Sequence, residues 1–342
     1  MSVLHLMGAA GDGGAETYFV DLVQALARSG VEQACAIRPH AARQAALADA
    51  GVPVTLAPFG GPFDLATRPR LQRLAEGLQP KVVLQWMNRA GRFAPRGPWA
   101  RIGRLGGYYD LKYYRGCDML VGNTQHIVDW LVAQGWPADR ATYIPNFARA
   151  EATGRIDRAS LDTPPHAPLL LGMGRLHPSK AHDVTLKALA SLPDAFAWIA
   201  GAGPLEEDLK AQARALGVAD RVRFLGWRND ASALYRTADI CVFPSRFEPL
   251  GNVVIQAWAH GLPIAAAASQ GPGALIRHGE TGLLSPVDDA DALAANLRSL
   301  IDDPGLRRRL ATAGQATGDA LFSEAAVVAR WKDLFARFGE AV

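Results

Sequence analysis

The sequence contains few cysteines and no long hydrophobic run. Its three cysteines, Cys35, Cys117 and Cys241, lie far apart and form no CxxC pair. This spacing argues against a disulfide framework and a zinc knuckle, and it favours a reducing compartment. No segment approaches the roughly 20 consecutive apolar residues of a membrane-spanning helix, and the first eight residues lack the basic and apolar regions of a signal peptide. We therefore expect a cytoplasmic protein.

The chain also lacks internal repeats and low-complexity segments. Of its 342 residues, 49% are hydrophobic and 20% are charged, a composition typical of globular proteins. The length fits two α/β domains. The net charge of +3 is unevenly distributed, because residues 1–150 hold 16 Lys and Arg against 11 Asp and Glu, whereas residues 151–342 hold 20 against 22. We therefore expect the first half to meet an anionic partner.

Short apolar runs alternate with helical patterns, which is typical of βαβ units around a parallel sheet. In the first half the pattern predicts strands at Val3–Met7, Val82–Trp86 and Met119–Gly122, and a helix at about Ala15–Arg28. Residues 149–168 are rich in Ala, Arg, Asp, Thr and Pro and predict a linker. In the second half we expect strands at Leu169–Met173, Ala197–Gly201, Val222–Leu225 and Ile240–Phe243, and helices at Asp183–Leu192, Glu206–Leu216, Ala231–Thr237 and Asn252–His260. Two such halves would bind a ligand beyond the carboxyl ends of their strands.

A glycine-rich turn, Gly8-Ala9-Ala10-Gly11-Asp12-Gly13-Gly14-Ala15-Glu16, follows the first strand. It is no dinucleotide fingerprint, because Glu16 stands where the last glycine would fall, and it lacks the GK[ST] of a P-loop. Glycines let the backbone approach a ligand, and the N–H groups that open the next helix suit a phosphate. An ordinary tight turn between strand and helix explains the run equally well.

A second loop runs from Gly172 to Lys180 and contains Arg175. Arginine offers a planar fork for two phosphate oxygens, and lysine offers a compact charge. Fixed cations suit a departing diphosphate, whose charge grows as its bond to sugar breaks. Taken alone, two solvated surface cations explain this loop better.

The third segment runs from Phe243 to Pro263, with Glu248 in a turn before a helix that opens near Leu250–Asn252. The free N–H groups of that helix provide a phosphate site, and Glu248 can accept hydrogen bonds from sugar hydroxyls. Gln256 lies further along the same helix. A role as dipole partner would explain Glu248 but not the whole run, so this segment favours a binding site.

The third segment resembles the signature of retaining glycosyltransferase family four (glycosyl transferases group 1), in which a Glu-x7-Glu element follows a Pro-Ser turn. The loop Gly174–Lys180 resembles the donor-phosphate clamp of that family. Further similarities lie in the family's order between residue 8 and about residue 287, at Gly13-Gly14-Ala15-Glu16, Ile144-Pro145-Asn146, Gly201-Ala202-Gly203-Pro204, Phe224-Leu225-Gly226 and Gly279-Glu280-Thr281-Gly282-Leu283-Leu284.

The resemblance implies the α/β GT-B fold, with two Rossmann-like doubly wound domains facing across a cleft and a C-terminal helix crossing back to the first domain. It implies an acceptor-binding domain at residues 1–150, joined by the helix at about 325–342, and a nucleotide-sugar-binding domain at residues 165–324. It also implies a retaining hexosyltransferase that uses a UDP- or GDP-sugar and needs no metal ion or other cofactor.

The resemblance also assigns site residues. Arg175 and Lys180 would neutralise the leaving nucleoside diphosphate, and Glu248 would bind hydroxyls of the donor sugar, so these three are the expected catalytic residues. The expected donor-binding residues are Gly13, Gly14, Gly174, Gly203, Leu250, Gly251, Asn252 and Gln256. The expected residues on the acceptor side are Glu16, Asn88, Arg89 and Arg92.

Three positions depart from the family's pattern. Gln256 replaces the second acidic residue, which usually faces the nucleotide ribose; an amide can still bind two hydroxyls. Ala181 replaces the glycine that usually follows the clamp lysine. The sequence Gln85-Trp86-Met87-Asn88-Arg89 stands where the family often has a histidine, so no side-chain base is assigned.

Basic and aromatic residues are interleaved between residues 81 and 115. They are Lys81, Arg89, Arg92, Phe93, Arg96, Trp99, Arg101, Arg104, Tyr108, Tyr109, Lys112, Tyr113, Tyr114 and Arg115. Such a segment can bind nucleic acid, an anionic bilayer or a phosphorylated saccharide, and a solvated face with core aromatics explains it nearly as well. Together with sugar transfer, it favours an anionic lipid-linked acceptor such as the lipopolysaccharide core, at the inner face of the cell membrane, and no nucleic acid.

Two alternatives remain open. A GT-B epimerase would isomerise the donor without an acceptor, and a non-catalytic protein would only bind sugar nucleotides, as Gln256 slightly favours. The sequence Asp289-Ala290-Asp291 matches a metal motif of the other major glycosyltransferase fold. It opens a predicted helix after a proline, so we expect it to cap that helix instead.

Overall fold

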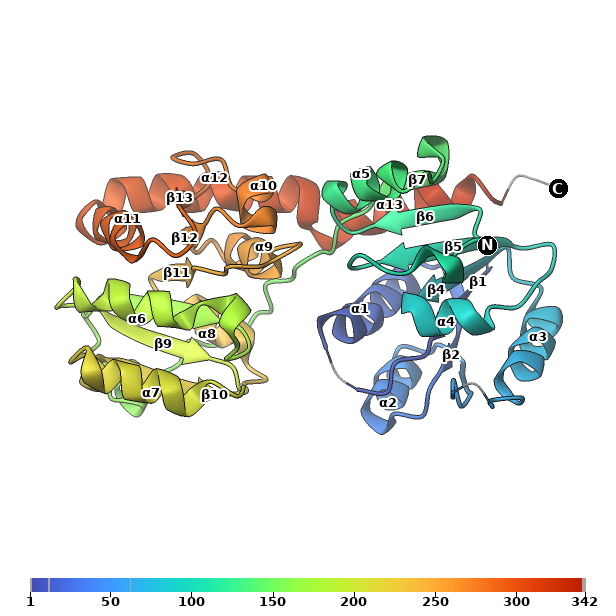
Figure 1. Cartoon of the computed structure of the whole chain (residues 1–342), viewed down its shortest axis with the longest axis horizontal. Coiled ribbons are helices and arrows are strands. Elements are labelled where there is room, and N and C mark those ends of the chain that lie inside the picture. The colour runs from blue at the N-terminus through green and yellow to red at the C-terminus, as the bar shows by residue number, and fades with distance from the viewer. Residues whose placement is uncertain (1, 12, 62, 340–342) are drawn as a thin grey trace. The chain divides into compact units, whose positions relative to one another are not determined.

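The computed structural model describes residues 2–11, 13–61 and 63–339. The chain divides into two compact units: unit 1 comprises Met1–Asn146 with Glu324–Val342, and unit 2 comprises Phe147–Ser323. Each unit is a parallel sheet with helices on both faces (Figure 1). The expected α/β class with two Rossmann-like, doubly wound domains is confirmed.

Unit 1 contains a seven-stranded sheet in the order β3-β2-β1-β4-β5-β6-β7. Its strands are β1 (Ser2–Met7), β2 (Glu32–Ile37), β3 (Val54–Leu56), β4 (Val82–Trp86), β5 (Ala100–Leu105), β6 (Met119–Gly122) and β7 (Ala141–Tyr143). Its helices are α1 (Gly14–Arg28), α2 (Ala41–Asp49), α3 (Thr67–Leu78), α4 (Met87–Phe93) and α5 (Gln125–Ala133). The chain order reverses between β1 and β4, so the carboxyl ends of these two strands mark the switch point where such sheets bind ligands.

Helix α13 (Glu324–Ala336) belongs to unit 1 although it lies near the end of the chain. Arg28 on α1 donates to both carboxylate oxygens of Glu324 at 2.9 and 3.0 Å. The side chains of Trp331 and Phe335 are fully buried. The expected return of a C-terminal helix to the first domain is confirmed; its last expected residues, 340–342, lie outside the described part.

Unit 2 contains a six-stranded sheet in the order β10-β9-β8-β11-β12-β13. Its strands are β8 (Leu169–Met173), β9 (Phe196–Ala200), β10 (Val222–Gly226), β11 (Ile240–Phe243), β12 (Ile264–Ala267) and β13 (Leu283–Ser285). Its helices are α6 (His182–Ala190), α7 (Glu206–Ala215), α8 (Ala231–Thr237), α9 (Asn252–Ala259), α10 (Gln270–Leu275), α11 (Ala290–Asp302) and α12 (Pro304–Phe322). Here the switch point lies between β8 and β11.

The strands are short apolar runs because both faces of a parallel sheet are covered by helices. In unit 2 two buried clusters fill the two faces: Leu170 and Ile199 belong to one, and Leu171 and Trp198 to the other. Alternate residues of β8 and β9 thus point to opposite faces, as strand geometry requires. Asp289 caps α11 by accepting a hydrogen bond from the backbone N–H of Ala292 at 2.8 Å, which confirms its expected capping role.

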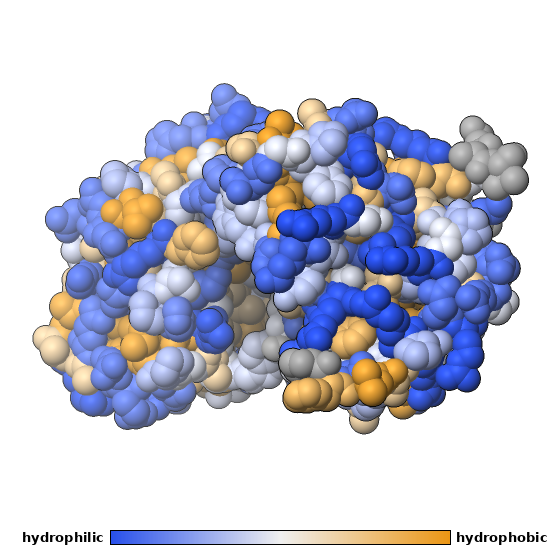
Figure 2. Space-filling view, turned by 45° about the vertical axis from the view of Figure 1, so that its right-hand side comes forward, coloured by the Kyte–Doolittle hydropathy of each residue, from blue (hydrophilic) through white to orange (hydrophobic). Residues whose placement is uncertain are grey.

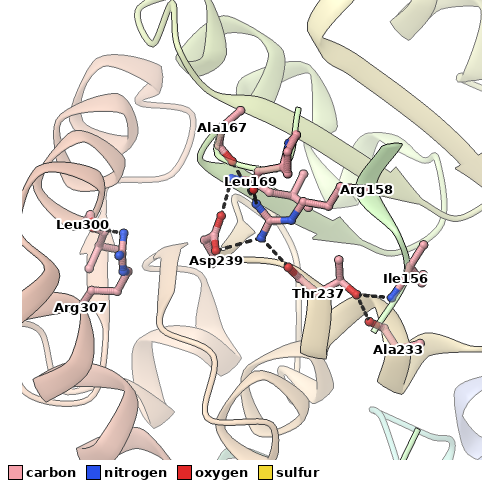
Figure 3. Close-up of polar contacts among 10 residues, drawn as sticks. Ile156, Arg158, Ala167, Leu169, Ala233, Thr237, Asp239, Leu300 and Arg307 are labelled. Atoms are coloured by element: carbon pink, nitrogen blue, oxygen red, sulfur yellow. Dashed lines mark hydrogen bonds and ion pairs between the residues drawn. The ribbon is translucent and has the colours of Figure 1, made fainter. Parts of the chain in front are cut away.

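Arg158 holds the segment before β8 against the rest of unit 2 (Figure 3). Its guanidinium donates to the backbone carbonyls of Thr237 at 2.6 Å and Ala167 at 3.1 Å, and it pairs with Asp239 at 2.9 Å. Asp239 also accepts a hydrogen bond from the backbone N–H of Leu169, the first residue of β8, at 2.9 Å. The C-terminal part of the predicted linker is therefore anchored to the amino ends of β8 and β11.

Replacing Arg158 with alanine should destabilise unit 2 by about 2–3 kcal/mol, because it removes several charged hydrogen bonds and leaves Asp239 unpaired. Denaturant unfolding measures the change. Arg155→Ala is the matched control, since Arg155 is exposed and has no partner in the described structure; it should change stability by less than about 0.5 kcal/mol. Equal effects of the two substitutions would contradict the anchoring role.

Candidate functional site

Lys180 and Glu248 meet at the carboxyl edge of the unit 2 sheet. Lys180 ends a short 3₁₀ turn (Pro178–Lys180) between β8 and α6, and Glu248 lies between β11 and α9. The Lys180 ammonium donates to Oε2 of Glu248, and both side chains are mostly buried. The structure thus brings together two of the three expected catalytic residues, which lie 68 positions apart in the sequence.

Backbone contacts fix the loop that carries Arg175. The backbone N–H groups of Gly174 and Leu176 donate to the carbonyls of Ala200 and Ala202, both at 3.0 Å. A Cβ atom at Gly201 would lie 2.0 Å from the carbonyl oxygen of Gly174, and one at Gly203 would lie 2.3 Å from that of Leu176. Only glycine allows such an approach. This is the physical reason for the Gly201-Ala202-Gly203 element, and it places Gly174 and Gly203 in adjacent loops.

Glu248 also connects to the start of α9. Its Oε1 accepts a hydrogen bond from the backbone N–H of Gly251 at 3.2 Å, and the side chain is only 9% exposed. Gly251 precedes α9 with φ of +83°, and Leu250 is buried beside it. The unpaired N–H groups of a helix start and its positive dipole end favour a phosphate. Leu250, Gly251 and Asn252 therefore lie beside Glu248, as expected from the sequence for a donor site.

Three further positions of the expected site have different surroundings: Arg175, Gln256 and Ala181. Arg175 is exposed and has no ion-pair partner among the described residues. The side-chain amide of Gln256, in the second turn of α9, has no hydrogen-bond partner in the described structure. Ala181 adopts φ of +54°, where a glycine would relieve about 1 kcal/mol of strain. Burial of its methyl group offsets about 0.8 kcal/mol of that strain, so alanine is tolerated there.

Arg246 joins the two loops, a role to which no sequence motif points. Its guanidinium pairs with Asp183 at 2.6 Å and with Asp288 at 2.5 Å, and it donates to the carbonyl of Pro178 at 2.9 Å. Its backbone N–H donates to the carbonyl of Ser179 at 2.9 Å. Burial raises the pKa of Asp183, but the hydrogen bonds and charge of Arg246 outweigh it and hold that pKa below its ordinary value. Arg246 thus fixes the Lys180 turn to the Glu248 turn.

In unit 1, the glycine-rich turn leads directly into α1. Gly13 precedes the helix, Gly14 opens it, and Glu16 lies in its first turn. A Cβ atom at Gly13 would lie 2.8 Å from Oε2 of Glu16, so this carboxylate folds back towards the turn. Asp12, in the same turn, lies outside the described residues. Gly13 and Gly14 belong to unit 1, whereas the other expected donor-binding residues lie in unit 2.

A pocket of about 620 Å³ lies at the carboxyl edge of the unit 1 sheet. Three of the four expected acceptor-side residues line this pocket, namely Asn88, Arg89 and Arg92. The fourth, Glu16, is not among the lining residues. The pocket is also lined by Ala9, Ala10, Arg38, Gly60, Gly61, Met87, Tyr109 and Tyr113. Of these, Arg38 and Tyr109 come from separate loops, and no sequence motif connects them.

Two features of this pocket are typical of a binding site. Met87, the first residue of α4, adopts φ of +62°, a conformation that costs about 1–2 kcal/mol and is found preferentially at functional sites. Oδ1 of Asn88 is buried without a hydrogen-bond partner in the described structure. A buried carbonyl oxygen without a donor costs free energy, and a ligand hydroxyl could supply that donor.

The basic and aromatic residues between 81 and 115 do not form one surface. Phe93, Trp99 and Tyr114 are core residues, and Arg104 is buried, which corrects their interpretation as one interaction surface. Lys112 and Arg115 are exposed beside Trp130 and Trp136 around a second hollow of about 520 Å³. Figure 2 turns unit 1 towards the viewer, where strongly hydrophilic side chains surround hydrophobic ones.

Two family models match the chain. The model of Glycosyltransferase Family 4 matches residues 12–151, and the model of Glycosyl transferases group 1 matches residues 155–317. Together they span the two βα series that precede and follow the predicted linker.

Two curated relatives come from Rhizobium meliloti (strain 1021). The chain is 36% identical over 329 residues to "Lipopolysaccharide core biosynthesis glycosyltransferase LpsE", covering 95% of this chain and 96% of the relative. It is 36% identical over 345 residues to "Lipopolysaccharide core biosynthesis glycosyltransferase LpsD", covering 98% of both. Among solved structures, Anabaena Alr3699/HepE in complex with UDP matches with a TM-score of 0.84 and 20% identity over 98% of this chain and all of that one.

Replacing Arg246 with leucine should loosen both loops of unit 2 together. We expect a loss of about 1.4 kcal/mol of local stability, because charged hydrogen bonds are removed, and therefore about tenfold faster amide exchange in residues 177–183 and 246–251. Hydrogen exchange with mass spectrometry measures both segments. Arg277→Leu is the control, since exposed Glu280 is the one ion-pair partner of Arg277 among the residues that the structure describes. Unchanged exchange in residues 177–183 would show that Arg246 does not fix that turn.

Proposed function

This chain belongs to glycosyltransferase family 4, and we propose that it transfers a hexose-type sugar from a UDP- or GDP-sugar to a saccharide of the lipopolysaccharide core. We further propose that the transfer retains anomeric configuration and needs no metal ion. The two Rhizobium meliloti relatives, which the chain matches over nearly their whole length, carry lipopolysaccharide core biosynthesis in their names. Those names support the choice of acceptor.

The observation that carries the proposal is the convergence of Lys180 and Glu248 beside the start of α9. A nucleotide sugar presents a diphosphate and a ring of hydroxyls. A cation and helix N–H groups suit the diphosphate, and a carboxylate suits the hydroxyls. Because Glu248 pairs with Lys180, its charge also keeps the ammonium near the helix start before a donor binds. Exposed Arg175, in the same loop as Lys180, supplies a second cation.

The proposed reaction breaks the bond between the anomeric carbon and the diphosphate oxygen. The acceptor hydroxyl forms a new bond to the same face of that carbon, and its proton passes to the departing diphosphate. Negative charge grows on the diphosphate as its bond breaks, so Arg175 and Lys180 stabilise the transition state more than the ground state. This scheme requires no side-chain base, which agrees with the lack of an assigned one, and fixed cations take the place of a metal ion.

The acceptor would bind in the unit 1 pocket. Arg38, Arg89 and Arg92 give its lining a positive charge, and Oδ1 of Asn88 lacks a donor. Burial raises the pKa of Tyr109, which keeps its hydroxyl protonated at neutral pH. Cations, a hydrogen-bond acceptor and aromatic rings together suit an anionic saccharide. In the same scheme Glu16 would contact the acceptor, and Gly13 and Gly14 would contact the donor.

A transfer assay tests the proposal and separates the alternatives. Lys180→Ala and Glu248→Ala should each lower kcat/KM at least about 100-fold, the effect of removing charge stabilisation from a transition state, while circular dichroism stays unchanged. Gln256→Glu should remain active, and Arg277→Ala is the matched control. The wild type is incubated with labelled UDP- and GDP-sugars and a lipid-extract acceptor, with and without EDTA, and the anomeric configuration of the product is read by NMR.

Each outcome of this assay decides between functions. Isomerised donor without transfer would indicate an epimerase, and binding without turnover would indicate a sugar-nucleotide-binding protein. An inverted product, or activity lost in EDTA, would contradict the retaining or the metal-free part. Near-normal turnover of Lys180→Ala would mean that the site lies elsewhere.

A lipid-linked acceptor also implies contact with a membrane surface. Within residues 2–11, 13–61 and 63–339, no helix is both long and apolar enough to cross a bilayer. We propose peripheral contact with the inner face of the cell membrane through exposed Lys112 and Arg115, with Trp130 and Trp136 beside them. Basic residues attract anionic lipid, and tryptophan favours the interface.

Vesicle flotation tests this contact. The wild type should float with vesicles that contain anionic lipid and not with neutral ones. Lys112→Glu combined with Arg115→Glu should lower the bound fraction at least about tenfold, because each basic residue near an anionic surface contributes about 1 kcal/mol. The control variant, Arg308→Glu with Arg309→Glu on α12 of unit 2, should bind like the wild type. Failure of the wild type to bind either vesicle would refute the membrane contact.

A further inference from the structure

Unit 1 contains a buried arginine at the carboxyl edge of its sheet. Arg104 lies near the end of β5, paired in register with Trp86 of β4 on one side and Val121 of β6 on the other. Arg104 is only 2% exposed. The guanidinium lies 5.0 Å from the ring centres of both Tyr18 and Trp86, so it makes a cation–π contact with each of these two neighbouring rings.

This charge has no counter-ion in the described part of the chain. The side chain donates one hydrogen bond, from Nη2 to Oδ1 of Asn146 at 2.5 Å, and no carboxylate pairs with it. The ionisable groups around it are the phenols of Tyr18, Tyr109 and Tyr114, which are uncharged at neutral pH. Burial lowers the pKa of Arg104, but an arginine remains charged in proteins.

Buried charges in proteins are normally paired, because removing an ion from water is costly. Stacking on two aromatic rings compensates a guanidinium only partly. In unit 2, half-buried Arg246 and Arg158 follow this rule, since each pairs with aspartate. An unpaired buried charge at the ligand-binding edge of a Rossmann-like sheet is therefore a candidate binding group.

Asn123 provides a second, independent observation. It follows β6 and is 5% exposed, and its Oδ1 is fully buried with no hydrogen-bond partner. Its backbone N–H donates to the carbonyl of Leu105, which fixes it next to the end of β5. The amide therefore presents an acceptor oxygen that the described protein leaves without a donor.

Gly106 brings Arg104 and Asn123 to one place. A Cβ atom at this position would lie 2.7 Å from Nη1 of Arg104 and 3.7 Å from Nδ2 of Asn123. Gly106 itself is partly exposed. The absence of a side chain thus lets the backbone of Gly106 lie directly against the Nη1 edge of the buried guanidinium and near the amide of Asn123.

We propose that Arg104 and Asn123, next to Gly106, form a binding site for one anionic group, phosphate or carboxylate, together with a hydroxyl beside it. The arginine fork binds the anion, and Oδ1 of Asn123 accepts from the hydroxyl. A sugar phosphate and a sugar acid both carry this pair of groups. As a subsite for the saccharide acceptor the assignment rests on the function proposed above, whereas its affinity for anionic sugars does not.

An anion-binding role accounts for a buried, unpaired arginine next to a strained residue, an arrangement that folding alone does not favour. Trp86 stacks on Arg104 and is followed by strained Met87, which lines the acceptor pocket, and Tyr109 both lines that pocket and lies near the arginine. An anion bound at Arg104 would therefore lie beside the proposed acceptor pocket. It would supply the counter-ion that Arg104 lacks among the described residues of unit 1.

Asn123→Asp is the decisive variant, because it places a permanent carboxylate beside Arg104. The new ion pair should raise the melting temperature and compete with any external anion. Affinity for glucose 6-phosphate and glucuronate should fall at least about tenfold, the effect of losing one charged hydrogen bond. Asn229→Asp is the matched control: Asn229 is exposed in unit 2, so the same change of charge should leave binding unaltered.

Arg104→Met is the second variant, which removes the charge and keeps most of the packing. It should abolish the preference for anionic sugars without lowering the melting temperature, because an uncompensated charge leaves the interior. Titration calorimetry with glucose 6-phosphate, glucuronate and neutral glucose measures all variants. Tight binding of glucose 6-phosphate alone would assign the site to phosphate, and binding of glucuronate alone would assign it to carboxylate.

Two results would overturn the proposal: no preference of the wild type for either anionic sugar over glucose, or wild-type affinity in both variants. If anion binding follows this pattern while no sugar transfer is detected, the site stands and the proposed function fails. If transfer occurs and Asn123→Asp changes neither the KM for the acceptor nor anion binding, the function stands and the site fails.

Discussion

The unit 2 site depends on how closely its loops approach one another. Gly201 and Gly203 let the Arg175 loop pack backbone against backbone, and Gly271 does the same for the Glu248 turn, where a Cβ atom would lie 2.7 Å from the carbonyl oxygen of Glu248. These contacts determine where the two loops begin. Arg246 then fixes their tips, so the ion pair between Lys180 and Glu248 results from a rigid frame and does not have to create one.

The two units treat charge differently. Unit 2 pairs half-buried Arg246 and Arg158 with aspartates and Lys180 with Glu248, so these three cations have a counter-charge before any ligand arrives. In the described part of unit 1, Arg104 has no counter-ion and Met87 is strained, both at the carboxyl edge of the sheet. Both features cost stability, and such costs concentrate where a protein binds or reacts. On this basis the candidate site of unit 2 is preorganised, whereas the site proposed at Arg104 of unit 1 would gain its counter-charge from a ligand.

The sequence predicted most of unit 2 because its strands are short apolar runs between clear helical patterns. The predicted strand Leu169–Met173 coincides with β8, and Ile240–Phe243 coincides with β11. It did not predict β5, because Arg101 and Arg104 interrupt the apolar pattern and looked like part of a basic surface. Local motifs identified Lys180 and Glu248, whereas Arg246, Arg38 and Asn123 acquire their roles only through long-range contacts that no spacing encodes.

Unit 1 is assembled from both ends of the chain, because α13 packs Trp331 and Phe335 into it after the whole of unit 2 has been made. A ribosome adds roughly 5–20 residues per second, so the delay is on the order of 10 s. During that time the surface that α13 will cover stays open, while unit 2 can already complete its own sheet. During synthesis in the cell, unit 2 can therefore complete its fold before unit 1, although unit 1 begins first.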